Sequence, residues 1–327
     1  MPSQLHRRTC NLCEAMCGLV IEHEEKNIIS IRGDKDDPFS KGHICPKAVA
    51  LKDVYEDPDR LRYPMKRTGD QWQRISWEEA ISAAVEGIQK VQDQHGANAL
   101  GFYAGNPNVH NIGSLLYISQ LIRAFKTKNR FSATSADQLP HHFASLFMFG
   151  HYFLIPVPDV DRTDFMLILG ANPLASNGSL MTAPGIDKRL KAIQQRGGQV
   201  VVIDPRRTET AAKASEHHFI KPGTDVFLLL AMVQVLFDED LVTFGESRLA
   251  EFTVGVGQIQ EAVQDFSPER VAAITGIAAA NIRQLARDFA KAPTAVCYGR
   301  MGVSTQAYGG LCHWLINTLN ILTDNFD

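Results

Sequence analysis

The sequence has no long apolar run and no strong excess of charge of either sign. Its longest uncharged apolar run, residues 226–237, spans twelve residues, whereas a membrane-spanning helix needs about 20. The 33 Lys and Arg residues nearly balance the 36 Asp and Glu residues, which gives a formal net charge of −3, and no long basic stretch is present. We therefore predict a chain without a membrane span and without general nucleic-acid binding.

The N-terminal residues also lack a readable export signal. Arg7 and Arg8 are not followed by the apolar segment that a secretory or twin-arginine signal requires. We therefore expect a cytoplasmic protein.

Cysteine is scarce, with six residues in 327, which is too few for a disulfide scaffold. Four of the six nevertheless lie in the first 45 residues, in the pattern C-x2-C-x3-C-x27-C, at Cys10, Cys13, Cys17 and Cys45. Three thiolates on one short turn can bind three corners of an Fe4S4 cluster, and a remote cysteine arriving from the end of a strand can bind the fourth. Structural zinc is the alternative, although zinc sites more often combine two close-spaced pairs.

The length and the 45% content of hydrophobic residues suffice for two or three domains. Residues 1–60 are predicted to form a small, loop-rich β unit, with strands at 18–22 and 28–32 and a solvated acidic loop at 34–38. Ser76 and Glu79 then form a capping box that begins a helix, and Gly96 ends it.

Strands and helices alternate regularly after residue 160. Strands are predicted at 165–169, 199–203 and 294–298, and helices at 186–195, 225–237, 279–290 and 311–322. Such β-α-β repetition predicts an α/β fold with a parallel sheet covered by helices on both faces.

Four motifs occur together in this order, namely Cys10-x2-Cys13-x3-Cys17, Gly42-His43-Ile44-Cys45-Pro46-Lys47, Leu169-Gly170-Ala171-Asn172-Pro173 and Val202-Ile203-Asp204-Pro205-Arg206. In combination they resemble the molybdopterin oxidoreductase family, also called the dimethyl sulfoxide reductase superfamily. The resemblance implies an Fe4S4 cluster beside a molybdenum or tungsten ion that two molybdopterin guanine dinucleotides hold. It also implies two-electron, oxo-transfer type chemistry on a small-molecule substrate, with an electron-transfer protein or subunit as partner.

With this resemblance, three domains are expected. They are an Fe4S4-binding domain at 1–60, an incomplete α/β domain with the metal-ligand loop at 61–160, and a Rossmann-like pterin dinucleotide-binding domain at 161–327. Family members also carry a C-terminal β-barrel domain, which this sequence lacks. We therefore expect a fragment or a truncated chain that is inactive by itself.

Several cofactor contacts are expected at the carboxyl ends of the strands. The turn at Gly170, Asn172 and Pro173 would let backbone amides approach a phosphate. Asp204 would accept a hydrogen bond from a ribose hydroxyl, or alternatively cap a helix. Further candidates are two guanidinium groups that suit phosphate, those of Arg206 and Arg207.

Other cofactor residues are implied chiefly by the resemblance. Asp225, in the segment Gly223-Thr224-Asp225, would receive the guanine edge, with helix capping as the alternative. Arg300 would contact a phosphate or pterin group. Lys47 matches a family lysine that lies between the cluster and the pterin.

The resemblance also assigns a protein ligand to the metal, and no cysteine stands at that position. Asp137 occupies it, with Ser135 as the rival and a loop cap as the alternative. His141 and His142 follow closely and are candidates for proton transfer. For His110 a structural role is the simpler prediction.

Four functional hypotheses therefore remain at the level of sequence. The first is a molybdopterin-dependent oxidoreductase, and the second is a molybdenum-free iron–sulfur relay or assembly subunit of the same fold. The third is a formate dehydrogenase-like enzyme, against which the missing cysteine ligand argues. The fourth is a zinc-containing nucleotide-binding protein.

Overall fold

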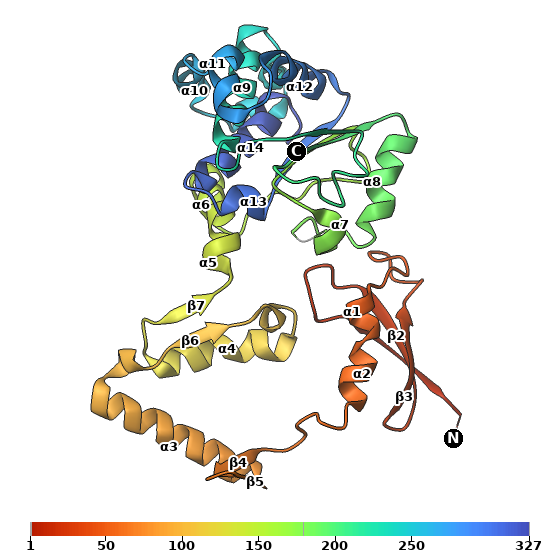
Figure 1. Cartoon of the computed structure of the whole chain (residues 1–327), viewed down its shortest axis with the longest axis vertical. Coiled ribbons are helices and arrows are strands. Elements are labelled where there is room, and N and C mark those ends of the chain that lie inside the picture. The colour runs from red at the N-terminus through yellow and green to blue at the C-terminus, as the bar shows by residue number, and fades with distance from the viewer. Residues whose placement is uncertain (1, 179, 327) are drawn as a thin grey trace. The chain divides into compact units, whose positions relative to one another are not determined.

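The computed structural model describes residues 2–178 and 180–326 (Figure 1). It divides into two compact units, Met1–Ala133 and Thr134–Asp327. The boundary between the units falls inside the segment 61–160, so the domain limits at 60 and 160 stay predictions.

The first unit begins with a three-stranded antiparallel sheet of β1 (Gln4–Thr9), β2 (Gly18–Glu24) and β3 (Asn27–Gly33), in the order β1-β2-β3. The strands predicted at 18–22 and 28–32 are thereby confirmed. Strand β1 was not predicted, because all six of its residues are exposed and it has no apolar alternation. Helices α1 (Pro46–Val49) and α2 (Leu51–Glu56) follow.

Two expectations for this region are wrong. Cys45 does not end a strand, because β3 stops at Gly33 and Cys45 is the N-cap of α1. The acidic loop is also more than a solvated segment. Asp34 is buried beside Arg7, and Asp37 accepts hydrogen bonds from both the backbone and the hydroxyl of Ser40. These contacts tie the loop to β2, since the Ser40 hydroxyl also accepts from the amide of Gly18.

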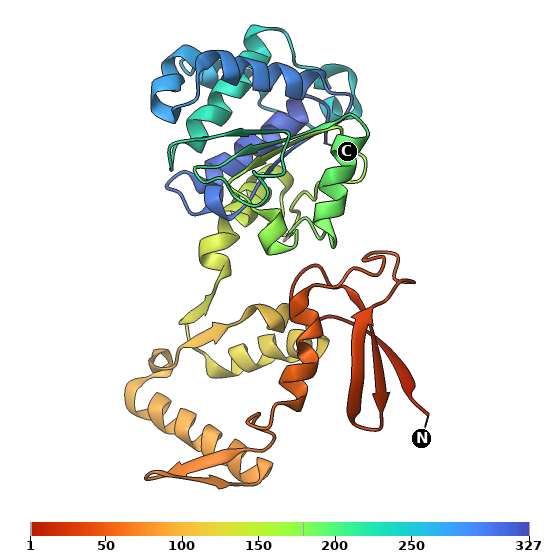
Figure 2. The same ribbon diagram turned by 45° about the vertical axis from the view of Figure 1, so that its right-hand side comes forward.

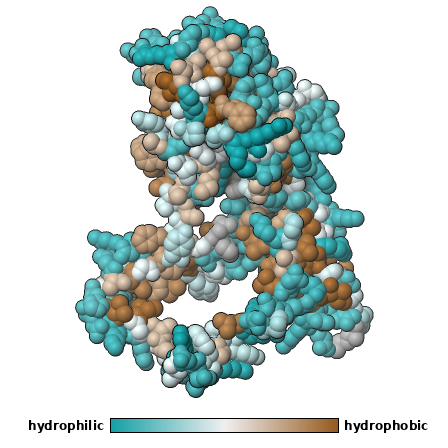
Figure 3. Space-filling view, viewed as in Figure 1, coloured by the Kyte–Doolittle hydropathy of each residue, from teal (hydrophilic) through white to brown (hydrophobic). Residues whose placement is uncertain are grey.

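The rest of the first unit has little buried hydrophobic surface. It contains the hairpin β4 (Met65–Thr68) and β5 (Gln71–Arg74), α3 (Trp77–His95), η1 (Ala97–Ala99), β6 (Phe102–Ala104), η2 (Asn106–Val109), α4 (Ile112–Phe125) and β7 (Arg130–Ser132). Ser76 caps α3 as predicted, since its hydroxyl accepts from the amide of Glu79 at 3.1 Å. No residue of α3 or α4 is buried, and Ile81, Leu116 and Tyr117 are each at least 60% exposed. Hydrophobic surface is accordingly visible over this region (Figure 3).

The second unit contains a parallel sheet in the order β10-β9-β8-β11. Its strands are β8 (Phe165–Leu169), β9 (Gln199–Ile203), β10 (Glu216–His218) and β11 (Ala295–Gly299). The helical segments are α5 (Thr134–Asp137), α6 (Leu139–Phe149), α7 (Pro173–Ser176), α8 (Ile186–Gln195), α9 (Asp225–Asp238), η3 (Phe244–Glu246), η4 (Arg248–Glu251), α10 (Val256–Val263), α11 (Pro268–Thr275), α12 (Ala279–Lys291), α13 (Met301–Ser304) and α14 (Gly309–Leu322). The predicted strands and helices after residue 160 are all present.

Both faces of this sheet are covered, as the apolar strands predict. Phe165, Leu167 and Leu169 pack into a core with α9, α12 and α14, whereas Met166 and Ile168 pack on the opposite face with α8 (Figure 2). Successive residues of β8 alternate between the two cores because strand side chains point to alternate faces. The mixed α/β fold is therefore confirmed.

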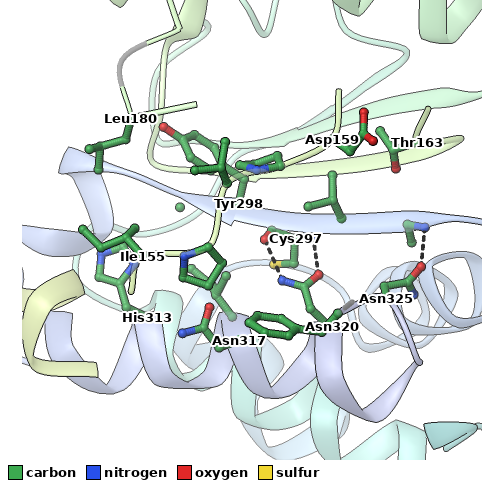
Figure 4. Close-up of a pocket in the computed structure, with 18 of the residues that line it drawn as sticks. Ile155, Asp159, Thr163, Leu180, Cys297, Tyr298, His313, Asn317, Asn320 and Asn325 are labelled. Carbon is green, nitrogen blue, oxygen red and sulfur yellow. Dashed lines mark hydrogen bonds between the residues drawn. The ribbon is translucent and has the colours of Figure 1, made fainter. Parts of the chain in front are cut away.

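Side chains form hydrogen bonds to the backbone along the outer edge of strand β11 (Figure 4). Asn320 accepts from the amide of Cys297 at 2.8 Å and donates to its carbonyl at 3.0 Å. Asn325 accepts from the amide of Ala295 at 2.7 Å, and His141 Nε2 lies 3.2 Å from the carbonyl of Gly299. These side chains take the place that a further strand would have, which satisfies buried backbone groups and blocks edge pairing.

Candidate cofactor site

The four N-terminal cysteines share one small core. Cys10 and Cys17 are buried in it, and Cys13 and Cys45 pack against it, together with Leu19 and Ala48. All four are free of disulfide bonds. Burial, helped by the neighbouring cysteines, raises the pKa of the Cys17 thiol to about 11. Thiolates in this core would therefore need the positive charge of bound metal.

The loop geometry explains how Cys45 reaches the other three. Gly33 and Gly42 approach so closely that a Cβ on Gly33 would lie 2.1 Å from the carbonyl oxygen of Gly42. Only glycine at position 33 allows this contact. It holds the segment before Cys45 against the end of β3, while the amide of Cys10 donates to the carbonyl of Cys17 at 2.8 Å.

Four free cysteines in one small core are a donor set that an Fe4S4 cluster or a zinc ion could take. Thiolates on a single zinc ion all lie about 2.3 Å from it. Thiolates on a four-iron cluster bind different corners and therefore stand further apart. Lys47 is exposed on α1, and its role stays a prediction.

In the second unit, the candidate residues lie where parallel strands end. Gly170 follows β8 and adopts φ +54°, and a Cβ there would lie 2.7 Å from the amide nitrogen of Val303. Its amide donates to Ile203, and its carbonyl accepts from Gly302 at 2.7 Å. The close approach that we expected therefore occurs, but toward the loop after β11. The amide of Gly170 is already engaged and has no free hydrogen for a phosphate.

The side chain of Asn172 is likewise engaged within the protein. It donates to Glu209 at 2.6 Å and accepts from the hydroxyl of Thr210 at 2.7 Å. Pro173 begins α7 and is buried. These contacts join the loop after β8 to the loop after β9, so they shape the edge of the sheet.

Asp204 directly follows β9 and lies in a tight turn. Its Oδ1 accepts from the amide of Arg206 at 2.8 Å. The alternative that Asp204 caps a helix is wrong, because residues 205–215 form turns and bends. Arg206 and Arg207 are exposed, with Arg206 3.7 Å from Glu209. Their guanidinium groups are accessible to a phosphate.

Asp225 is the most enclosed carboxylate of this edge. It is only 3% exposed, and it is the first residue of α9, while Thr224 holds the N-cap position. Burial raises the pKa of the Asp225 carboxyl, and the nearby Asp204 adds to the shift. Gln306 opposes the shift by donating to Asp225 Oδ2 at 2.7 Å. Gly223 precedes this helix start with φ +82°.

Arg300 and Asp137 form an enclosed ion pair. The two Nη atoms of Arg300 donate to Asp137, at 2.7 Å to the carbonyl and 3.4 Å to Oδ2. Arg300 Nε is buried and has no partner among the described residues. Asp137 ends the short helix α5, on which Ser135 is exposed. Arg300 thus fixes Asp137 and keeps one donor, Nε, for another group.

The ring of His141 lies against the ring of His313, with the centroids 3.4 Å apart and the ring planes tilted by 31°. His141 Nε2 must carry a proton to donate to the carbonyl of Gly299, which leaves Nδ1 as a buried acceptor without a donor in the described structure. Burial and the charge of Arg300 lower the pKa of His141 to about 4. His141 is therefore neutral near pH 7, and its Nδ1 can accept a hydrogen bond but is a weak base. Burial also lowers the pKa of His142.

A cavity of about 710 Å³ runs along the outer edge of β11 and reaches His313 at one end (Figure 4), and His141 also lines it. Asp204 and Asp225 do not line it. This cavity therefore differs from the surface predicted to hold a dinucleotide.

Gln306 and His313 were not predicted from the sequence. Gln306 lies between α13 and α14 and belongs to none of the sequence motifs. His313 had a usable signal, because a titratable residue inside a largely buried helix needs a buried partner, and it has one in Ser304 at 2.8 Å.

Two protein-family models match this chain. The model of the molybdopterin oxidoreductase family matches residues 60–327, and the model of the molybdopterin oxidoreductase Fe4S4 domain matches residues 4–56. The chain belongs to the molybdopterin oxidoreductase family. Membership implies an Fe4S4 cluster and a molybdenum or tungsten ion with two pterin cofactors, and the four clustered cysteines fit the first of these.

Individual relatives of this molybdopterin oxidoreductase chain are diverse. It is 29% identical to the probable oxidoreductase YoaE of Bacillus subtilis, over 98% of this chain and 46% of that protein. It is 28% identical to the thiosulfate reductase molybdopterin-containing subunit PhsA of Salmonella typhimurium, over 97% and 41%. Among solved structures, acetylene hydratase from Pelobacter acetylenicus matches with a TM-score of 0.80 at 25% identity, over 98% and 43%. The chain thus spans less than half the length of these relatives.

In the described part of the chain, no helix combines the length and apolarity needed to cross a membrane.

Proposed function

We propose that this chain is the cofactor-binding part of a molybdopterin-dependent oxidoreductase that acts on a small-molecule substrate by oxo-transfer type chemistry. The observation that carries the proposal is the gathering of four unpaired cysteines around one core in a chain of this family. The metal would supply the two-electron redox chemistry, and the cluster would supply single-electron transfer to a partner protein or subunit.

The chain's own residues have distinct proposed roles. Cys10, Cys13, Cys17 and Cys45 would bind the cluster, and Lys47 would lie near it. Along the edge of the sheet, Asp204 would hold a ribose and Asp225 a guanine. The loops at Gly170, Asn172, Pro173, Gly223 and Thr224 would shape the edge, and Arg206 and Arg207 would pair with phosphates.

Asp137 is the proposed protein ligand of the metal, with Ser135 as its rival. A carboxylate is a hard oxygen ligand that suits a high-valent metal. Arg300 supports the proposal by holding the carboxylate through Oδ2, which leaves Oδ1 for a further partner. His141 would take part in proton transfer by accepting a hydrogen bond at Nδ1, because a pKa of about 4 makes its ring a weak base near pH 7.

Metal and pterin analysis of the complete protein tests this function. We expect one molybdenum or tungsten per four iron atoms, together with extractable pterin. Iron without pterin would instead favour the molybdenum-free relay or assembly subunit, and zinc without broad visible absorbance would favour the zinc-containing protein. The formate dehydrogenase-like activity can be assayed on the same preparation. Location in the cytoplasm stays a prediction of the N-terminal sequence.

A further inference from the structure

We propose that Gln306 is a positioning residue in a site for a guanine nucleotide. Its side chain fixes the carboxylate of Asp225 so that both carboxylate oxygens face the guanine edge. The proposal rests on the proposed guanine site at Asp225 and adds the residue that gives this site its selectivity.

The hydrogen bonds of Gln306 determine the orientation of its side-chain amide. Nε2 donates to Asp225 Oδ2 and to the carbonyl of Gly302, each at 2.7 Å. Both partners are acceptors, so the nitrogen must face them. The amide oxygen then faces away, and it is buried without a donor in the described structure.

Asp225 needs such a partner. Its side chain lies at the start of α9 and is 3% exposed, so few water molecules can hold it in one orientation. The carboxylate could otherwise rotate or take up a proton, and a protonated carboxyl would present a donor to the ligand. The contact from Gln306 restrains the rotation and favours the ionised form.

The ligand that satisfies this arrangement presents adjacent donors. The guanine edge carries a ring N–H beside an amino group, which matches the two oxygens of a carboxylate. The second amino hydrogen is available for the unpartnered oxygen of Gln306. Hypoxanthine lacks the amino group, and adenine places an acceptor beside its donor. The pair Asp225–Gln306 should therefore prefer guanine to both.

Binding of GDP to the full chain prepared without cofactor tests the proposal, with IDP and ADP as comparison nucleotides in calorimetric titrations. Gln306→Leu removes the donor and should weaken GDP binding about tenfold, while reducing the preference for GDP over IDP. Gln284→Leu is the matched control, because Gln284 also donates to an aspartate at 2.7 Å but is exposed on α12. It should leave both affinities unchanged.

A second variant gives a readout that loss of folding would not produce. Gln306→Glu sets two carboxyl groups against each other, so GDP binding should be weak at pH 8 and recover below about pH 6, where the pair shares a proton. Wild-type affinity should not show this recovery. A pH profile of Gln306→Glu that parallels the wild type would overturn the positioning role.

Asp225→Asn separates the inference from the function on which it rests. If the wild type binds no GDP, or if Asp225→Asn leaves GDP affinity unchanged, the guanine site itself is wrong. If Asp225→Asn abolishes binding while Gln306→Leu keeps both affinity and preference for GDP, only the role of Gln306 is wrong.

Discussion

At the scale of single residues, glycines and buried histidines carry constraints that composition does not reveal. Gly170 combines a left-handed backbone with contact to the loop after β11, and His141 is enclosed between Gly299 and His313. The residue type required at each of these two positions therefore depends on a neighbour that is far away in sequence.

Gly170→Ala should destabilise the second unit by about 3 kcal/mol, because the new Cβ meets backbone atoms of Gly302 and Val303 at 2.7–2.9 Å. Gly197→Ala is the matched control. Gly197 has φ +91° and no atom within 4 Å of the place that a Cβ would take, so only the backbone strain of about 1–2 kcal/mol applies. Denaturation followed by the fluorescence of the partly buried Trp314 measures both. Equal losses would contradict the close-contact argument.

His141 should make stability depend on pH. Its pKa is about 4 in the folded chain and near 6.5 when unfolded, so the unfolded state binds more protons between these values. The contribution to stability is complete above pH 6.5 and is lost as pH falls toward 4, with a decrease of about 2 kcal/mol between pH 7 and pH 5.

His141→Gln keeps a donor for Gly299 but does not titrate, so its stability should fall less between pH 7 and pH 5. His313, whose pKa is lowered by burial and by the facing His141 and Arg300, retains part of the dependence. His6→Gln on the exposed strand β1 serves as the control. Identical pH profiles for the wild type and His141→Gln in chemical denaturation would refute this assignment.

At the scale of secondary-structure elements, strand β11 illustrates how an edge is completed without another strand. Its outward backbone groups are satisfied by side chains from α14, from the segment after it and from α6. Asparagine is suited to this role because its amide presents a donor and an acceptor side by side, as a backbone peptide does.

Asn320→Leu should therefore destabilise the second unit by about 2–4 kcal/mol, because both the amide and the carbonyl of Cys297 lose their partner. Asn281→Leu, on the exposed surface of α12, should change stability by less than about 0.5 kcal/mol. Chemical denaturation of both variants provides the comparison. A loss at Asn320 no larger than that at Asn281 would show that the edge does not need this amide.

At the scale of the whole molecule, the cysteines and the carboxylates of the two candidate sites belong to different units of the chain. The cysteine core lies in Met1–Ala133, and the carboxylate edge of the parallel sheet lies in Thr134–Asp327. None of the four clustered cysteines belongs to the second unit, so each group can be altered while the other is monitored.

Cys13→Ser should abolish the visible absorbance of an iron–sulfur cluster in the complete protein, because one of four thiolate ligands is lost. The affinity for GDP should change less than about twofold, since Cys13 lies outside the second unit. Cys312→Ser, which replaces a buried thiol of α14, should leave the visible spectrum intact. An unchanged spectrum in Cys13→Ser would refute the ligand assignment.

The sequence by itself determined the elements that have strong local signals. The apolar strands and helices after residue 160 agree with the observed ones within a few residues, because their burial on both faces leaves continuous apolar runs. Ser76 determined the start of α3 through a local cap. The spacing of the cysteines predicted that all four lie together around one metal group, and they share one small core. The polar strand β1 carried no such signal.

Only the tertiary structure decided which groups meet across long separations. The pairs Asp137–Arg300 and Asp225–Gln306 join residues 163 and 81 positions apart, and no local pattern encodes them. The same holds for Gly170, whose amide was expected to face a ligand and instead bonds within the sheet. Hydrogen-bond partners and burial are properties of packing, so the sequence can propose the chemistry of a site, while the fold determines which atoms remain available for it.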